Sequence, residues 1–182
     1  ITIKGLVGQQ RYYWDTRGLV RGLDAEVSLN DIVKPWAEAK TRLTLGGSFV
    51  SKYEGDETIL SDVSGYKLNL PHNVGAASVR MDLARGGFGL QAEYARKGQD
   101  PSIMNNYIYK NGEALWMSAS YSQKGLSANI QAKRVDNMGF KSVRSVSGEM
   151  LYINYTPSIT KQHTYAFLSM YPYATQSTGE MG

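Results

Sequence analysis

The stretch AEAKTRLTLGGSF, residues 37–49, decides the fold class, because apolar and polar side chains alternate along it. Its odd positions include Leu43, Leu45 and Phe49, whereas its even positions include Glu38 and Arg42. A period of two is the repeat of a β-strand, in which successive side chains point to opposite faces. The stretch therefore predicts a strand with one apolar side and one charged side.

The same alternation recurs along most of the 182 residues. It predicts about nine strands, near residues 2–14, 17–29, 37–53, 74–85, 87–97, 113–123, 125–135, 149–156 and 162–171. More than half of the chain would then be strand, well above the roughly 20–25% that soluble globular domains contain. Such an excess favours a barrel or a sandwich.

The connections distinguish these two architectures. Residues 85–87, 123–125 and 156–161 form short connections, and the long polar stretches 54–73, 98–112 and 136–148 lie between them. The early connections fit less well, because residues 30–35 suit a short turn but residues 14–17 would make an unusually brief outer loop. Transmembrane barrels alternate short periplasmic turns with longer outer loops, and a sandwich has no reason to keep that order. We therefore predict an all-β fold, an antiparallel up-and-down transmembrane β-barrel, localised in the bacterial outer membrane.

Aromatic residues give an independent indication of the membrane. On the side expected to face lipid, one group stands near the short connections and another near the long ones: Phe88, Tyr121, Tyr155 and Tyr165 in the first, and Tyr53, Tyr94 and Tyr171 in the second. Two belts of aromatic rings flanking an apolar band are typical of barrel strands in a bilayer.

Composition excludes several classes of function. The chain has no cysteine, which removes disulfides, thiolate nucleophiles and Cys-bound zinc. No apolar run approaches the ~18–20 residues of a membrane-spanning helix. The net charge of +4 is spread along the chain, whereas nucleic-acid binding needs a concentrated basic face, so we expect no nucleic-acid partner. We expect no cofactor and no metal.

Charged residues on the polar side are expected to line a watery lumen. The six that we select are Lys40, Arg42, Arg80, Asp82, Glu93 and Lys133. Both signs are present, so we expect pairing across neighbouring strands rather than the single-sign rings of a selective ion pore.

Three arginines, Arg21, Arg96 and Arg134, fall on the lipid-facing side near the long-loop ends of their strands. An arginine costs about 2–4 kcal/mol at the bilayer midplane but little near an interface. We therefore expect all three at the outer leaflet, in contact with outer-membrane lipid and with the phosphates of lipopolysaccharide. The alternative is that they lie beyond the membrane edge in water.

The sequence offers little for catalysis, and we do not expect an enzyme. His72 lies in a long loop and His163 beside a short turn, so the topology places the only two histidines at opposite ends of the barrel. A surface hydrolase with His72 as base would be the exception. Acidic residues of one loop, including Glu54 and Asp62, lack the spacing of a calcium loop.

An odd number of strands is unusual in a single-chain bacterial barrel, and the last residues are polar, so we expect this chain to be a fragment of a larger barrel. Four segments resemble an uncharacterised Bacteroidetes-type family of outer-membrane β-barrel proteins: GLVRGLD (18–24), YARKGQDP (94–101), KRVDNM (133–138) and MYPYATQ (170–176). The resemblance implies a Gram-negative outer-membrane barrel longer than this chain, and it assigns no role to any residue.

Together these patterns predict a porin-like channel, a transporter component or an assembly scaffold, with other outer-membrane proteins as candidate partners. The alternative is a soluble or secreted β-sandwich or lipocalin-like protein that binds a ligand. The two differ in where the apolar side points. In the first, Leu43, Leu45, Leu90 and Ile130 meet lipid, and in the second they fill a closed core.

Overall fold

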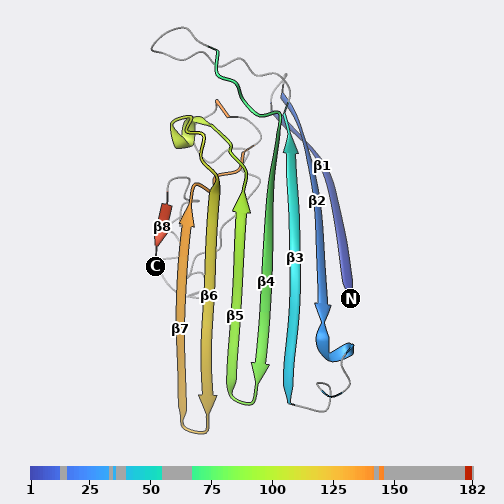
Figure 1. Ribbon diagram of the computed structural model, residues 1–182, viewed down its shortest axis with the longest axis vertical. Helices are drawn as coiled ribbons and strands as arrows, with labels where there is room; N and C mark the ends of the chain where they lie inside the picture. The colour runs from blue at the N-terminus through green and yellow to red at the C-terminus, as the bar shows by residue number, and fades with distance from the viewer. Residues whose placement is uncertain are drawn as a thin grey trace.

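The computed structural model describes residues 1–12, 16–32, 35, 40–54, 67–141, 144–145 and 179–181. Residues 10–12, 16, 17, 31 and 179–181 are described by their backbone alone. Within these ranges the protein forms one antiparallel β-sheet, in which the strands lie side by side in chain order (Figure 1).

Seven long strands make up the sheet. They are β1 (Thr2–Tyr12), β2 (Thr16–Ser28), β3 (Thr41–Tyr53), β4 (Asn73–Arg85), β5 (Phe88–Lys97), β6 (Gly112–Gln123) and β7 (Leu126–Asp136). The short strand β8 (Gly179–Met181) pairs with the end of β7. Two 3-10 turns, η1 (Leu29–Asp31) and η2 (Ile103–Asn105), lie in connections. No described strand pairs with the outer edge of β1, so the described strands form an open sheet and not a closed barrel.

From β3 onward, tight turns lie at one end of the sheet and long connections at the other (Figure 1). The first two connections depart from this order, because three residues join β1 to β2 at the long-loop end and twelve join β2 to β3 at the short-turn end. The β4–β5 and β6–β7 hairpins each turn in two residues, because Arg85 pairs with Phe88 and Gln123 pairs with Leu126. Each turn contains a glycine with positive φ, at +58° for Gly86 and +82° for Gly125. Only glycine adopts this conformation without a steric penalty, so these two residues fix the registers of their hairpins.

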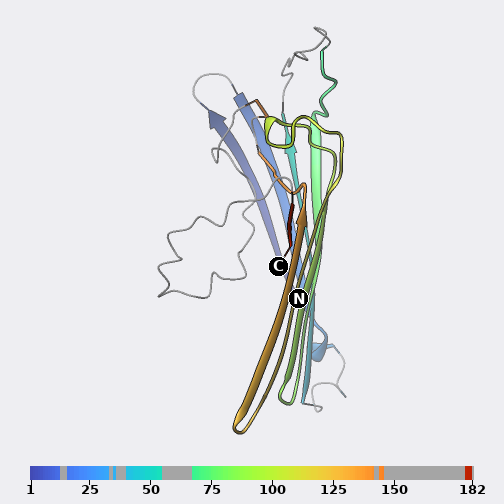
Figure 2. The same ribbon diagram turned by 90° about the vertical axis from the view of Figure 1, so that its left-hand side faces the viewer.

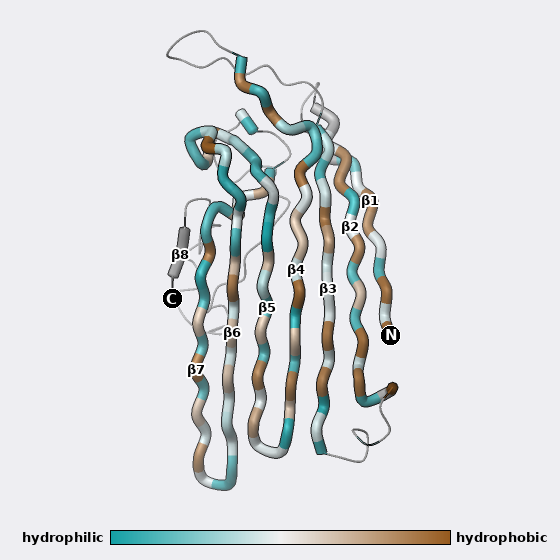
Figure 3. The backbone as a smooth tube through the Cα atoms, in the orientation of Figure 1, coloured by the Kyte–Doolittle hydropathy of each residue, from teal (hydrophilic) through white to brown (hydrophobic). Residues whose placement is uncertain are grey.

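The sheet has an apolar face and a polar face. The apolar face bears the odd-numbered residues of β1, β2, β3, β4 and β6 and the even-numbered residues of β5 and β7; the polar face bears the others. One row across the apolar face, for example, runs Leu43, Leu83, Leu90, Ala119 and Ile130. Figure 3 shows more hydrophobic and more hydrophilic residues following one another along the strands.

The pattern of burial is the reverse of that in a soluble domain, because more polar than apolar side chains are buried among the described residues. Among the described residues, five hydrophobic side chains are buried and twelve polar or charged ones are. Three of the five, Val20, Val74 and Val135, stand on the polar face. Many large apolar-face side chains are exposed instead, with 63% of Val79 and 75% of Ile130 accessible. Nothing in the described part of the chain covers the apolar face.

The polar face is the concave one. Seen from the side, β1 and β2 lean to the same side of β3–β7 as the segment that follows β7 (Figure 2). That segment reaches Lys52 and Lys97, whose side chains belong to the polar face. The sheet therefore curves around its charged side.

The predicted all-β class and the antiparallel up-and-down order are confirmed. The ranges expected for seven strands overlap β1–β7, with ends that differ by up to four residues. The largest difference is at β3, expected from residue 37 and observed from Thr41. The side chain of Asn30 binds the carbonyl of Thr41 and the N–H of Leu43, so it occupies positions that would otherwise extend the ladder toward β2. The strands expected at 149–156 and 162–171 lie outside the described residues.

Candidate functional site

A charged network occupies the polar face near the middle of the strands. Arg80 of β4 donates to both carboxylate oxygens of Asp24, at 2.6 and 3.1 Å, and lies 3.2 Å from Glu26. Ser48 donates to Asp24 at 2.6 Å and accepts from Arg80 at 2.8 Å. We call Asp24, Glu26, Ser48 and Arg80 the Arg80 cluster.

This cluster does not follow the expected pairing between neighbouring strands. Arg80 is in register with Glu93 of β5, yet its guanidinium extends across β3 to reach β2. Gly46 of β3 makes the crossing possible, because a Cβ at this position would lie 2.6 Å from the Nε of Arg80. The missing side chain thus leaves a slot in which the arginine lies.

A hollow of about 440 Å³ opens beside the Arg80 cluster. Four of the six residues expected to line the lumen line it: Arg42, Arg80, Asp82 and Glu93. Gln91 and Trp116 complete its polar and aromatic wall, and the side-chain amide of Gln91 donates to Asp82 at 2.8 Å.

The other two expected lumen residues lie elsewhere. Lys133 is the register partner of Trp116 on the polar face and is 4% exposed. Lys40 is exposed and stands just before β3, at the short-turn end. The structure therefore brings four of the six residues into one site and leaves Lys40 outside the strands.

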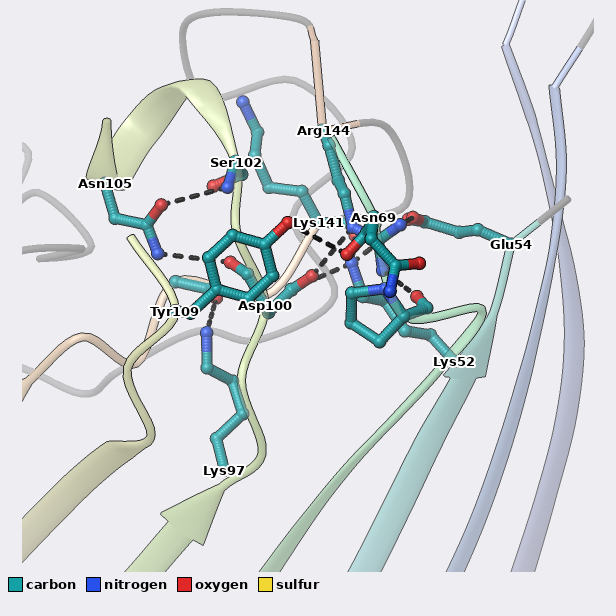
Figure 4. A network of polar contacts seen from close by, with 12 residues as sticks. Lys52, Glu54, Asn69, Lys97, Asp100, Ser102, Asn105, Tyr109, Lys141 and Arg144 are labelled. Carbon is teal, nitrogen blue, oxygen red and sulfur yellow. Dashed lines mark hydrogen bonds and ion pairs between the residues drawn. The ribbon is translucent and has the colours of Figure 1, made fainter. Parts of the chain in front are cut away.

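A second ionic network lies at the long-loop end of the polar face (Figure 4). Lys52 Nζ lies 3.1 Å from Glu54 Oε1 and 2.9 Å from Asp100 Oδ2. Arg144 closes the circuit, with Nε 3.0 Å from Asp100 Oδ1 and Nη1 3.2 Å from Glu54 Oε2. Opposite charges alternate around this circuit, and we call the four residues the ion ring. Each of their side chains is at most 6% exposed.

The ion ring joins segments that are far apart in the sequence. Lys52 also donates to the carbonyl of Lys141, and Arg144 donates to that of Pro71. Beside the ring, Lys97 donates to the carbonyl of Gly139. The long connections are therefore fastened against the polar face at three backbone carbonyls.

Two asparagines and an aromatic ring extend the network. Asn105 donates to the carbonyl of Asp100 at 3.1 Å and to Asn137 Oδ1 at 2.9 Å, and it accepts from the N–H of Ser102 at 2.9 Å. The ring of Phe140, 1% exposed, lies 5.3 Å from Lys52 Nζ, which is a cation–π distance. Residues 98–111 and 137–141 thus form a packed layer at this end of the sheet.

Glu54 is the least well stabilised member of the ion ring. Its Oε2 lies within ion-pair distance of Arg144, but no donor in the described part of the chain makes a hydrogen bond to it. Burial raises the pKa of the Glu54 carboxyl above its usual range, against the opposing effect of Lys52 and Arg144. The carboxyl is thus held between a desolvation cost and two nearby cations.

Sequence reasoning did not identify the ion ring. Lys52 and Lys97 fall on the side of the sheet expected to face the lumen but are not among the six selected residues, and Glu54 is expected only as a loop acid. Asp100 and Arg144 lie in loops that have no periodicity, 44 residues apart, so no local pattern links them. The only available indication was the side of the sheet on which Lys52 and Lys97 fall.

The three arginines expected at the outer leaflet, Arg21, Arg96 and Arg134, all lie on the apolar face and are exposed. Arg21 donates to Asn73 at 3.4 Å. Among the expected aromatic residues, Phe88 and Tyr121 are register partners on the apolar face, and Tyr53 and Tyr94 are also exposed there. Tyr155, Tyr165, Tyr171 and His163 lie outside the described residues.

Neither a metal site nor a membrane-spanning helix is found among the described residues. In the ranges that the structure describes, no three His, Cys, Asp or Glu residues are placed to hold a metal ion. His72 stacks on Tyr53, with ring centroids 6.5 Å apart. None of the described helices is both long and apolar enough to cross a membrane.

Comparison with known proteins gives one match. No curated protein and no solved structure matches the chain. Residues 1–182 match a family described as a family of unknown function, DUF6029, and that description contains nothing about a membrane or a group of bacteria. The resemblance to Bacteroidetes-type outer-membrane barrels therefore stays a prediction. Because the match spans every residue, the chain belongs to the DUF6029 family.

Proposed function

We propose that this chain forms part of the wall of an outer-membrane β-barrel, which acts as a channel, a transporter component or an assembly scaffold. The observation that carries the proposal is the exposed apolar face of a sheet whose concave, charged face holds the buried side chains. In water such a face would promote aggregation, whereas acyl chains would cover it without any further protein layer.

The height of the apolar face fits a bilayer. On β6 the apolar-face positions between Glu113 and Gln123 are Leu115, Met117, Ala119 and Tyr121. Ten residues of strand span about 33 Å, and a tilt of about 40° reduces this to roughly 25 Å of height. That is the height of the lipid-facing band in outer-membrane barrels.

The three apolar-face arginines stand on different rows of the sheet. Followed through the register to β2, the row of Arg96 meets Leu23 and that of Arg134 meets Ala25, two and four positions nearer the short-turn end than Arg21. What supports contact with outer-membrane lipid is their shared apolar face, where guanidinium groups would bind lipopolysaccharide phosphates in bidentate fashion. Replacing all three with glutamine should reduce the lipopolysaccharide that copurifies with the protein.

The polar face would then line the watery interior. Its charges are of both signs and are largely paired within the Arg80 cluster and the ion ring, which argues against a strongly ion-selective pore. Strands that complete the wall would pair with the open edge of β1.

Two measurements test this function. The full-length protein should fractionate with outer membranes and require detergent for extraction, and it should produce conductance steps in a planar bilayer if it is a channel. Membrane fractionation without conductance would favour the scaffold role. Full recovery in the aqueous fraction without detergent would contradict the proposal and favour the soluble ligand-binding alternative.

A further inference from the structure

Arg80 lines the hollow beside the Arg80 cluster without filling it. The guanidinium extends over Gly46 toward Asp24 and Glu26, on the β2 side. Its register partner Glu93 lines the hollow from β5, and Trp116 lines it from β6. A volume of about 440 Å³ lies within the range of small-molecule sites, about 300–1,000 Å³.

The lining combines an indole ring with planar polar groups. Trp116 is half-buried in a position where its neighbours on the sheet are charged, namely Glu93 on one side and Lys133 on the other. Glu93 and Asp82 supply acceptors, Arg42 supplies donors, and Gln91 supplies both. Both signs of charge are present, so no single-sign field selects an ion.

We propose that this hollow is a binding site for a neutral oligosaccharide. The face of an indole carries partial negative charge, which attracts the C–H groups on one side of a sugar ring. The sugar's hydroxyls are both donors and acceptors, and they match carboxylates, an amide and a guanidinium around one ring. An inorganic ion would need one sign of charge, and a lipid chain would need an apolar wall. Neither is present in the lining.

This inference deepens the proposed function, on which it rests, because the watery interior would bring the solute to the hollow. The two can fail separately. Binding is measured on purified full-length protein in solution, with detergent if needed, and does not require that the protein be in a membrane. Fractionation tests the membrane claim without reference to any sugar.

Intrinsic fluorescence gives a direct readout, because the chain has three tryptophans, Trp14, Trp36 and Trp116. In the variant Trp14→Phe/Trp36→Phe only Trp116 emits. Maltotriose, cellotriose and chitotriose are the probes, and glutamate, arginine and inorganic phosphate are the charged comparisons. We expect a saturable change in emission with at least one trisaccharide and none with the charged solutes.

Calorimetry on the otherwise unmodified chain locates the site. Trp116→Ala should weaken trisaccharide binding about tenfold, as expected for the loss of a stacking platform, and Trp116→Phe should retain part of the affinity. Glu93→Gln should weaken binding severalfold. Asn129→Ala, on the same face but outside the hollow, is the control and should bind like the unmodified chain.

Three results would overturn the proposal. The first is no saturable response to any of the three sugars at millimolar concentration, by fluorescence or by calorimetry on the unmodified chain. The second is an affinity that Trp116→Ala and Glu93→Gln leave unchanged in folded protein. The third is a response to charged solutes in place of the sugars.

Discussion

The Arg80 cluster and the ion ring are built from the same kinds of residue on the same face, but they differ in their exposure to water. The Arg80, Asp24 and Glu26 side chains are 28%, 28% and 45% exposed, whereas those of the ring are at most 6%. Exposed ion pairs contribute little to stability, and breaking a buried one leaves a charge that water cannot reach. The cluster therefore shapes a site, and the ring fastens the loops that cover one end of the sheet.

The largest expected effect comes from opening the ring at Asp100. Asp100→Ala would leave Lys52 and Arg144 buried with one carboxylate between them, and we expect the free energy of unfolding to fall by about 3–5 kcal/mol. Denaturant titration measures this. Asp136→Ala is the control, since its pair with Lys110 is partly exposed. Equal losses in the two variants would contradict the distinction between the networks.

Filling the slot under Arg80 should have a smaller effect. Gly46→Ala places a Cβ 2.6 Å from Nε, so the guanidinium must move away from Asp24. We expect a loss of about 1 kcal/mol or less in unfolding free energy, because the arginine side chain is flexible and its ion pairs are partly exposed. The neighbouring variant Gly47→Ala, whose Cβ would meet nothing closer than 3.6 Å, should lose nothing. A neutral Gly46→Ala would show that the slot is not needed.

The raised pKa of Glu54 predicts a pH dependence of modest size. Because the folded protein holds this proton more tightly than the unfolded chain, the contribution of Glu54 to stability is fully present below the ordinary pKa of 4.5 and is lost as pH rises through the raised pKa. Denaturation midpoints measured across that interval should decline in the unmodified protein and decline less in Glu54→Gln. A stability that instead rises with pH through Glu54 would reverse the sign and contradict this account of the ring.

A similarly small effect is expected from removing the arginine of the exposed network itself. Arg80→Met should change stability far less than Asp100→Ala, because water can solvate Asp24 and Glu26 once the arginine is gone. The remaining difference should shrink in high salt, since partly exposed pairs are screened. Unfolding curves at low and high ionic strength measure both. If Arg80→Met lost as much unfolding free energy as Asp100→Ala, the distinction between the exposed cluster and the buried ring would be contradicted.

Much of the fold could be predicted from the sequence because its determinants are local. Alternation along residues 37–49 and its repeats fix strands and faces, and the glycines of the two tight turns fix where hairpins reverse. The same alternation placed Arg42, Arg80, Asp82 and Glu93 on one face, where the hollow lies.

The rest could not be predicted because it depends on register and on loop folding. The Arg80–Asp24 pair requires that Gly46 lie between them on β3, which follows only once three strands are aligned. The ion ring requires Asp100 and Arg144 to meet over Lys52, and all three lie in different segments. Neither arrangement leaves a periodic trace in the sequence.

The most direct test of the central claim, that the apolar face meets lipid, uses the absence of cysteine from the chain. Single cysteines at Val79 and Ile130, and at their polar-face neighbours Ser78 and Asn129, would carry a fluorophore in protein reconstituted with nitroxide-labelled lipid. We predict strong quenching at Val79 and Ile130 and little at Ser78 and Asn129. Equal quenching at all four positions, or stronger quenching at Ser78 and Asn129, would contradict the account.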